Sequence, residues 1–107
     1  MGTELGRGGK NLAIKTERKT PSLSRPSKYQ VYLLNDDYTP MDFVVVVLQE
    51  FFAMNLSQAV KIMMNIHHNG RAMCGIYTRD IAETKVVQVN EFARINGHPL
   101  LCKMEKV

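Results

Sequence analysis

Residues 29–52, YQVYLLNDDYTPMDFVVVVLQEFF, decide the fold, because they contain a strand, a turn and a helix start in succession. Val31 and Leu33 alternate with Gln30 and Tyr32, the period-two pattern of a strand. The sequence Asp-Asp-Tyr at 36–38 then favours a turn. We predict that Thr39 caps a helix with Pro40 at its first position, where a missing amide hydrogen costs nothing.

The helix predicted after Pro40 contains four consecutive valines, residues 44–47, which locally favour a strand. Val44, Val47, Leu48 and Phe51 nevertheless recur at helical spacing. We predict a helix, because the start signal and the length of the segment outweigh local propensity.

Outward from this stretch, a second helix is predicted from Asn55 to His68. Gln58 is placed to bond back to the cap at Asn55, and Asn69-Gly70 is a typical left-handed stop. A strand over 71–77 follows. Its alternation predicts that Ala72, Cys74 and Ile76 share one face.

Thr78 is predicted to cap a third helix that stops at Asn96-Gly97, and Leu100 to Lys106 alternates as a third strand. The predicted order is therefore β-α-α-β-α-β. So short a chain cannot cover both faces of a sheet with helices. We expect an α+β fold with a three-stranded antiparallel sheet and three helices packed on one face.

Charge divides the 107 residues into two parts. Residues 1–27 hold six basic and two acidic groups, and residues 28–107 hold eight of each, so the whole net charge of +4 lies in the first part. That part lacks helical or strand periodicity, which predicts a flexible, disordered N-terminal extension before a core domain at 28–107. The core domain at 28–107 carries no net positive charge that would attract nucleic acid. Without a membrane span or a secretory signal, the cytoplasm is the predicted location.

Catalytic and metal motifs are absent from the sequence: there is no glycine-rich phosphate loop, no GxSxG and no HExxH. His67 and His68 point about 100° apart on a helix, so they cannot share one metal. A zinc site with Cys74 would match no standard spacing. Cys74 and Cys102 are interpreted as structural thiols. We therefore expect no cofactor, no metal and no enzyme.

The segment NDDYTPM, residues 35–41, is the strongest candidate binding element. It combines an amide and two carboxylates with an aromatic residue and a methionine. Such a mixture suits a ligand with a cation beside a hydrophobic group, as at the N-terminus of a peptide. A plain turn followed by a helix cap explains the same residues. An acid–base pair of Asp36 and Asp37 is a weaker interpretation.

Three longer segments resemble the ClpS adaptor family. They are LLNDDYTPMDFVVVVLQEFF, MMNIHHNGRAMCGIYTRDIAETKVVQVN and GHPLLCKMEKV, and the resemblance spans residues 28–107. It implies an adaptor that binds proteins beginning with Leu, Phe, Tyr or Trp. The adaptor would deliver them to the AAA+ unfoldase ClpA, or to the related ClpC, for degradation by ClpP. The unfoldase pore is expected to engage an N-terminal tail such as residues 1–27.

The resemblance also implies roles for individual residues. Those that would bind the substrate α-amino group are Asn35, Asp36 and His67. Those that would line the side-chain pocket are Asp37, Thr39, Met41, Val44, Met63, Ile66 and Leu100. Those that would dock on the N-terminal domain of the unfoldase are Asp80, Glu83, Thr84 and Lys85. Ile66 departs from the smaller valine of familiar members, and this predicts a narrower pocket.

Helical spacing agrees with part of this site, since Met63, Ile66 and His67 lie at i, i+3 and i+4 and share a helix face. Core packing would produce the same stripe. For the predicted docking residues, the alternative is the solvated first turns of a helix. A ribosome-associated module on the same fold remains open, because fold alone does not fix function. A hydrolase using Asp36 and His67 would lack a nucleophile.

Overall fold

The computed structural model describes residues 26–107, so the predicted N-terminal extension lies outside the described residues up to residue 25. The elements are β1 (Lys28–Leu34), α1 (Met41–Phe52), α2 (Leu56–Asn69), β2 (Arg71–Thr78), α3 (Arg79–Ile95) and β3 (Leu101–Lys106). This β-α-α-β-α-β order confirms the prediction. In the described part of the chain, no helix combines the length and the apolar character needed to cross a membrane.

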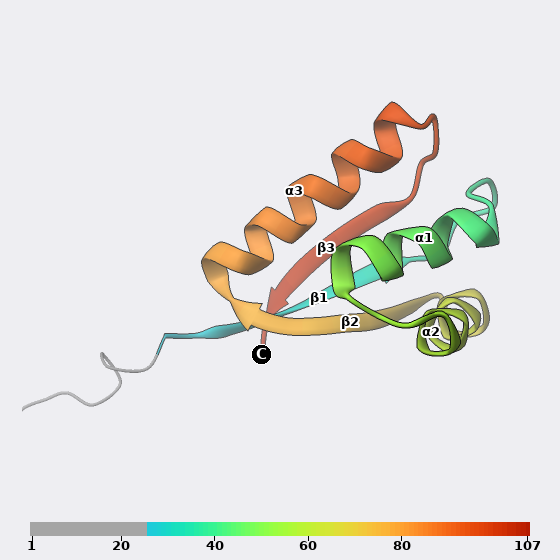
Figure 1. The fold of residues 1–107 in the computed structure, drawn as a ribbon. Coiled ribbons are helices and arrows are strands. Elements are labelled where there is room, and N and C mark those ends of the chain that lie inside the picture. Colours follow the sequence, from blue (N-terminus) through green and yellow to red (C-terminus); the bar gives the residue numbers. More distant parts are fainter. Residues whose placement is uncertain (1–25) are drawn as a thin grey trace, which may run out of the picture.

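The sheet has the strand order β2-β1-β3, and the central strand β1 pairs antiparallel with both neighbours. The helices cover one face of this sheet, as predicted (Figure 1). Among them, α1 packs on α2 and α3, α2 packs beside β2, and α3 crosses all three strands. The turn between β1 and α1 therefore lies close to α2.

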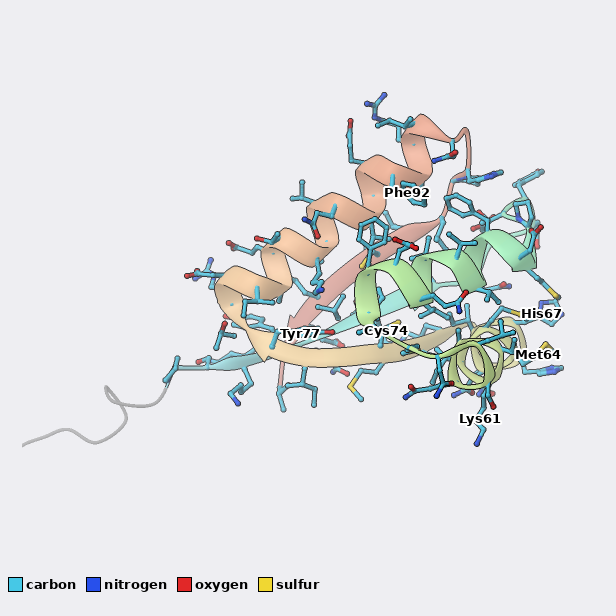
Figure 2. The ribbon with its side chains drawn as sticks, viewed as in Figure 1. Lys61, Met64, His67, Cys74, Tyr77 and Phe92 are labelled. Atoms are coloured by element: carbon cyan, nitrogen blue, oxygen red, sulfur yellow. The ribbon has the colours of Figure 1, made fainter. Side chains whose placement is uncertain are left out.

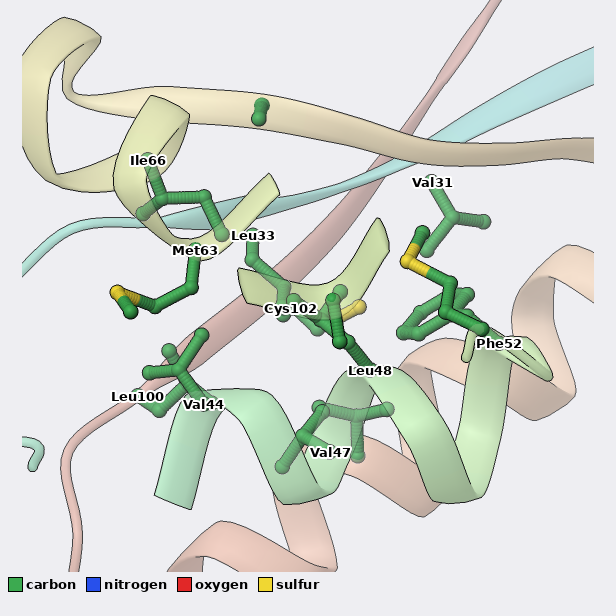
Figure 3. Close-up of a cluster of buried hydrophobic side chains, with 14 of the residues drawn as sticks. Val31, Leu33, Val44, Val47, Leu48, Phe52, Met63, Ile66, Leu100 and Cys102 are labelled. Atoms are coloured by element: carbon green, nitrogen blue, oxygen red, sulfur yellow. The ribbon is translucent and has the colours of Figure 1, made fainter. Parts of the chain in front are cut away.

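The core lies between the sheet and the helices (Figure 3). Its largest fully buried side chains come from every layer and are Val31, Leu33, Val47, Leu48, Val89 and Cys102. Burying a side chain of this size contributes about 1.5–3 kcal/mol, more than the few tenths by which a β-branched residue weakens a helix. The valines at 44–47 are therefore helical, because Val44 and Val47 reach the core from α1.

A β-bulge in β2 corrects the predicted alternation of this strand. Val31 pairs with Gly75 while Tyr32 pairs with Met73, so Cys74 is an extra residue. In β2, each side chain after this extra residue points to the opposite face of the sheet from the one predicted. Ile76 is therefore 50% exposed, although it was expected to share the inner face, and Tyr77 packs on the core instead. A Cβ at Gly75 would collide with the Tyr77 ring, so a larger residue there would displace that ring.

The helix starts differ from one another in how they are capped. Asn55 caps α2 as predicted, and its side chain accepts a hydrogen bond of 2.8 Å from the backbone N–H of Gln58. Thr78 occupies the N-cap position of α3 without a side-chain hydrogen bond. The predicted cap at Thr39 is wrong, because α1 begins at Met41 with Pro40 as its N-cap. The side chain of Thr39 is bonded within the preceding turn.

Candidate functional site

The turn between β1 and α1 is held by the carboxylate of Asp36. Its Oδ1 accepts hydrogen bonds from the backbone N–H groups of Tyr38 and Thr39, at 2.8 and 2.7 Å. Its Oδ2 accepts a third from the Thr39 hydroxyl at 2.8 Å. The N–H of Asn35 donates to the Gly70 carbonyl at 2.8 Å and so fixes the turn to the end of α2. The backbone of this turn is thus set before any ligand binds.

The same contacts set the charge of Asp36. Partial burial on its own would raise the pKa of this carboxyl group. The N–H groups of Thr39 and Tyr38, the Thr39 hydroxyl and the nearby His98 outweigh burial and hold the pKa below its ordinary value. Asp36 is therefore ionised at neutral pH, and the turn carries a fixed negative charge.

A pocket of about 240 Å³ opens between this turn, α1 and α2. Polar groups of the turn form one side of it, and apolar side chains of the two helices form the other. The residues that line it are Asn35, Asp36, Asp37, Thr39, Met41, Val44, Met63, Ile66 and His67. The structure thus brings together nine of the ten residues named as amine-binding or pocket residues from the sequence.

The depth of the pocket follows from which helix faces reach it. Val44, Met63 and Ile66 are buried and form its inner wall, whereas Met41 is 45% exposed at its rim. Leu100 is the tenth named residue and does not line the pocket. It is buried behind the wall, next to Val44 and Met63 (Figure 3).

The two adjacent histidines of α2 have different positions relative to this pocket. Their rings meet edge to face at 5.4 Å, and only His67 lines the pocket. Within residues 26–107 no three His, Cys, Asp or Glu side chains are grouped to hold a metal ion. Burial raises the pKa of the Cys74 and Cys102 thiols to about 12, so both remain protonated at neutral pH.

Two residues near the pocket, Tyr38 and His98, were not among the site residues named from the sequence. The His98 ring lies 4.4 Å from the Phe43 ring, centroid to centroid, and His98 contributes to lowering the pKa of Asp36. Tyr38 is 80% exposed on the same turn. The position of Tyr38 between two predicted site residues could have identified it as a neighbour of the pocket. The sequence around His98 contains no such signal, because only packing of the loop after α3 brings His98 beside the turn.

A second, shallower hollow of about 430 Å³ lies on the outward face of α3. Its lining residues are Asp80, Glu83, Thr84, Val87 and Gln88, and Val87 is 66% exposed. Three of the four residues named for docking thus lie together. The fourth, Lys85, points to the inner side of α3, where its Nζ donates to the Phe51 carbonyl at 2.6 Å.

Comparisons with known proteins identify the family and the fold of this chain. The family model described as "ATP-dependent Clp protease adaptor protein ClpS" matches residues 24–103. The ClpS adapter protein of Xanthomonas oryzae pv. oryzae is 58% identical over 93 residues, which cover 87% of this chain and 88% of that protein. The ClpS of Xylella fastidiosa is 57% identical over 94 residues, 88% of this chain and 89% of the relative.

Among solved structures, ClpS2 of Agrobacterium tumefaciens bound to L-phenylalaninamide superimposes with a TM-score of 0.76. The two chains are 42% identical, and the match covers 78% of this chain and 100% of the other.

Proposed function

Because the chain belongs to the ClpS family of ATP-dependent Clp protease adaptors, which are not themselves enzymes, we propose both the ligand that the chain binds and the protein to which it delivers this ligand. The ligand is a protein whose first residue is Leu, Phe, Tyr or Trp, with a free α-amino group. The destination is the AAA+ unfoldase ClpA, or its relative ClpC, which feeds ClpP in the cytoplasm. The observation that carries the proposal is the pocket with an ionised carboxylate on one side and a buried apolar wall on the other.

The α-amino group is the first half of the proposed ligand. An ammonium offers three donors and no acceptor, so it needs acceptors and a negative charge. Asp36 supplies the charge, Asn35 a side-chain oxygen and His67 a ring nitrogen. Hydrogen bonds to charged groups contribute about 1.5–3 kcal/mol each. The lowered pKa of Asp36 supports this role, because the carboxylate is charged at neutral pH, where an α-amino group is largely protonated.

The first side chain is the second half. L-phenylalaninamide, the ligand of the Agrobacterium ClpS2, carries a free α-amino group next to a benzyl group. The same pair of features fits the present pocket, with the ammonium at Asp36 and the ring against Val44, Met63 and Ile66. Burying a side chain of this size contributes about 1.5–3 kcal/mol.

Delivery uses other parts of the chain in this proposal. The outward face of α3, with Asp80, Glu83 and Thr84, docks on the N-terminal domain of the unfoldase. Residues 1–27 are then the segment that the unfoldase pore engages. A truncation that begins at Ser24 tests the last step: peptide binding and docking should persist, while degradation of a Leu-first reporter should stop. Unimpaired degradation would exclude a delivery role for the extension.

The core of the proposal is tested by fluorescence anisotropy with peptides that differ only in their first residue. Peptides beginning with Leu, Phe, Tyr or Trp should bind, and those beginning with Ala, Ser or Glu should not. The matched control is the Phe-first peptide with an acetylated N-terminus, which keeps the ring and loses the charge. Equal affinity for the acetylated and free peptides would contradict recognition of the amine.

A further inference from the structure

The side chain of Asn90 joins α3 to the edge strand β3. Its Nδ2 donates a hydrogen bond to the Cys102 carbonyl oxygen at 3.1 Å, and its Oδ1 accepts one from the Cys102 N–H at 2.8 Å. The amide of asparagine offers both a donor and an acceptor, as a peptide group does. Asn90 thus binds both backbone groups of Cys102, as a residue of a neighbouring strand would.

The backbone of Cys102 needs such a partner. β3 pairs with β1 on one side only, and in an antiparallel edge strand every second residue turns its N–H and C=O away from the sheet. Cys102 is 1% exposed, so water does not supply these hydrogen bonds. A buried peptide group left without partners would destabilise the fold, and Asn90 prevents this at the start of β3.

The segment that connects α3 to β3 is held at both of its ends. At the end next to α3, the His98 N–H donates to the Ala93 carbonyl at 2.9 Å. At the end next to β3, Asn90 holds Cys102. Because Leu100 lies between these two points and only two residues before Cys102, a shift of Cys102 along α3 would displace Leu100 with it.

This segment supports the pocket from behind. Leu100 packs against the inner wall, next to Val44 (Figure 3). The His98 ring lies 4.4 Å from the Phe43 ring of α1. On its other side, the Phe43 ring stacks at 5.3 Å on the ring of Phe92, which points from α3 toward α1 (Figure 2). The placement of residues 98–100 therefore bears on where α1 and its pocket residues lie.

We infer that Asn90 is a positioning residue for the pocket, because it fixes the start of β3 on α3 and thereby holds Leu100 against the inner wall. That the pocket takes the first side chain of a protein rests on the proposed function. Without the Asn90 amide, the start of β3 is held by β1 alone. The wall then loses its support, and the bound side chain loses part of its packing.

The first test compares Asn90→Ala with Asn55→Ala in the full chain. Each substitution removes an asparagine side chain that bonds to the backbone, but Asn55 caps the start of α2 and does not line the pocket. Asn55→Ala is therefore a control for lost stability alone. We expect the melting temperature to fall by about 5–15 °C in Asn90→Ala and by about 4–8 °C in Asn55→Ala. An unchanged melting temperature in Asn90→Ala would overturn the inference.

Peptide affinity is then measured by fluorescence anisotropy at a temperature where the variants are folded. Asn90→Ala should bind a Phe-first peptide about tenfold more weakly than the unmodified chain, and Asn55→Ala should stay within about twofold. Asn90→Gln keeps the amide on a longer stem and should recover part of the loss. It also replaces Asn90→Ala in this comparison if that variant does not fold. Unchanged affinity in the folded Asn90 variant, or an equal loss in Asn55→Ala, would contradict a positioning role.

Nuclear magnetic resonance measures the position of the segment without any ligand. The Cys102 amide should exchange its hydrogen at least about tenfold faster in Asn90→Ala, relative to the amides of the central strand β1. The methyl signals of Leu100 should shift in Asn90→Ala and stay in place in Asn55→Ala. Unshifted Leu100 signals would overturn the inference. If the unmodified chain binds no peptide, the proposed function is wrong, and these signals still decide whether Asn90 positions Leu100.

Discussion

The pocket and the outward face of α3 differ in how their polar groups are held. At the pocket, both oxygens of Asp36 already accept hydrogen bonds from the turn, and buried side chains form the wall. On α3, Glu83 pairs with Arg79 at 3.2 Å with both side chains more than half exposed, and the Thr84 hydroxyl donates to its own helix. A preorganised pocket suits a small ligand that is selected by its shape. An exposed face suits a large partner protein that binds through a large contact area.

This difference predicts that substitutions in the two regions affect separate functions. The largest effect should come from Asp36→Ala, because Asp36 both supplies the charge and holds the turn. Affinity for a Phe-first peptide should fall at least about 100-fold, since the charged hydrogen bonds lost contribute about 1.5–3 kcal/mol each. Anisotropy measures this loss. Asp42→Ala, an exposed acid in the first turn of α1, is the control and should stay within about threefold.

Asp36→Asn separates the two roles of this residue. Asparagine keeps one acceptor for the turn and loses the charge. If its affinity matched that of the unmodified chain, the charge would not matter for binding, and the site would act through shape alone.

A smaller effect is expected at the rim of the pocket. Met41 is the exposed residue there, and a β-branched first residue would meet it with its second Cβ substituent. Met41→Ala should raise affinity for Ile-first and Val-first peptides by about tenfold while Leu-first peptides still bind. A variant that continues to exclude Ile and Val would show that another residue sets this limit.

A charge reversal tests the outward face of α3, the second of the two regions compared. Glu83→Lys should weaken docking on the unfoldase N-terminal domain by about tenfold, because opposed charges at an interface are unfavourable. Its affinity for a Phe-first peptide should stay within about twofold, since Glu83 does not line the pocket. Loss of peptide binding in this variant would mean that the two regions are not independent.

The smallest effect concerns pH. The folded pKa of Asp36 lies below its ordinary value of 3.8, so its contribution to stability is complete above that value. It is lost as the pH falls through the lowered pKa. The difference in melting temperature between the unmodified chain and Asp36→Asn should therefore be constant from pH 7 to about 4 and shrink below that. A difference that shrinks between pH 7 and 5 would contradict an already ionised carboxylate.

Most of the fold could be predicted because its signals are local. The cap at Asn55, the stop at Gly70 and the helical spacing of Val44 and Val47 depend on neighbours in sequence. The bulge could not be predicted, because Ile76 and Tyr77 are both apolar enough to face inward, and only pairing with β1 chooses between them.

The site residues were named by resemblance, and their placement depends on tertiary contacts. Thr39 was predicted to cap a helix because threonine often does. Its hydroxyl instead donates a hydrogen bond to the nearby carboxylate of Asp36. The positions of Leu100 and Lys85 could not be predicted from the sequence for a similar reason. Leu100 lies one layer deeper than the pocket surface, and the direction of a long lysine side chain is set by partners distant in sequence.

The bulge at Cys74 also affects how this molecule behaves among unfolded chains. In the strand order β2-β1-β3, β2 is an edge strand, and a regular edge offers a row of free amide and carbonyl groups to any extended polypeptide. An extra residue in that edge kinks it and breaks the even spacing that an added strand would need. This Clp protease adaptor is thereby protected, along this edge, from self-association and from unspecific strand addition.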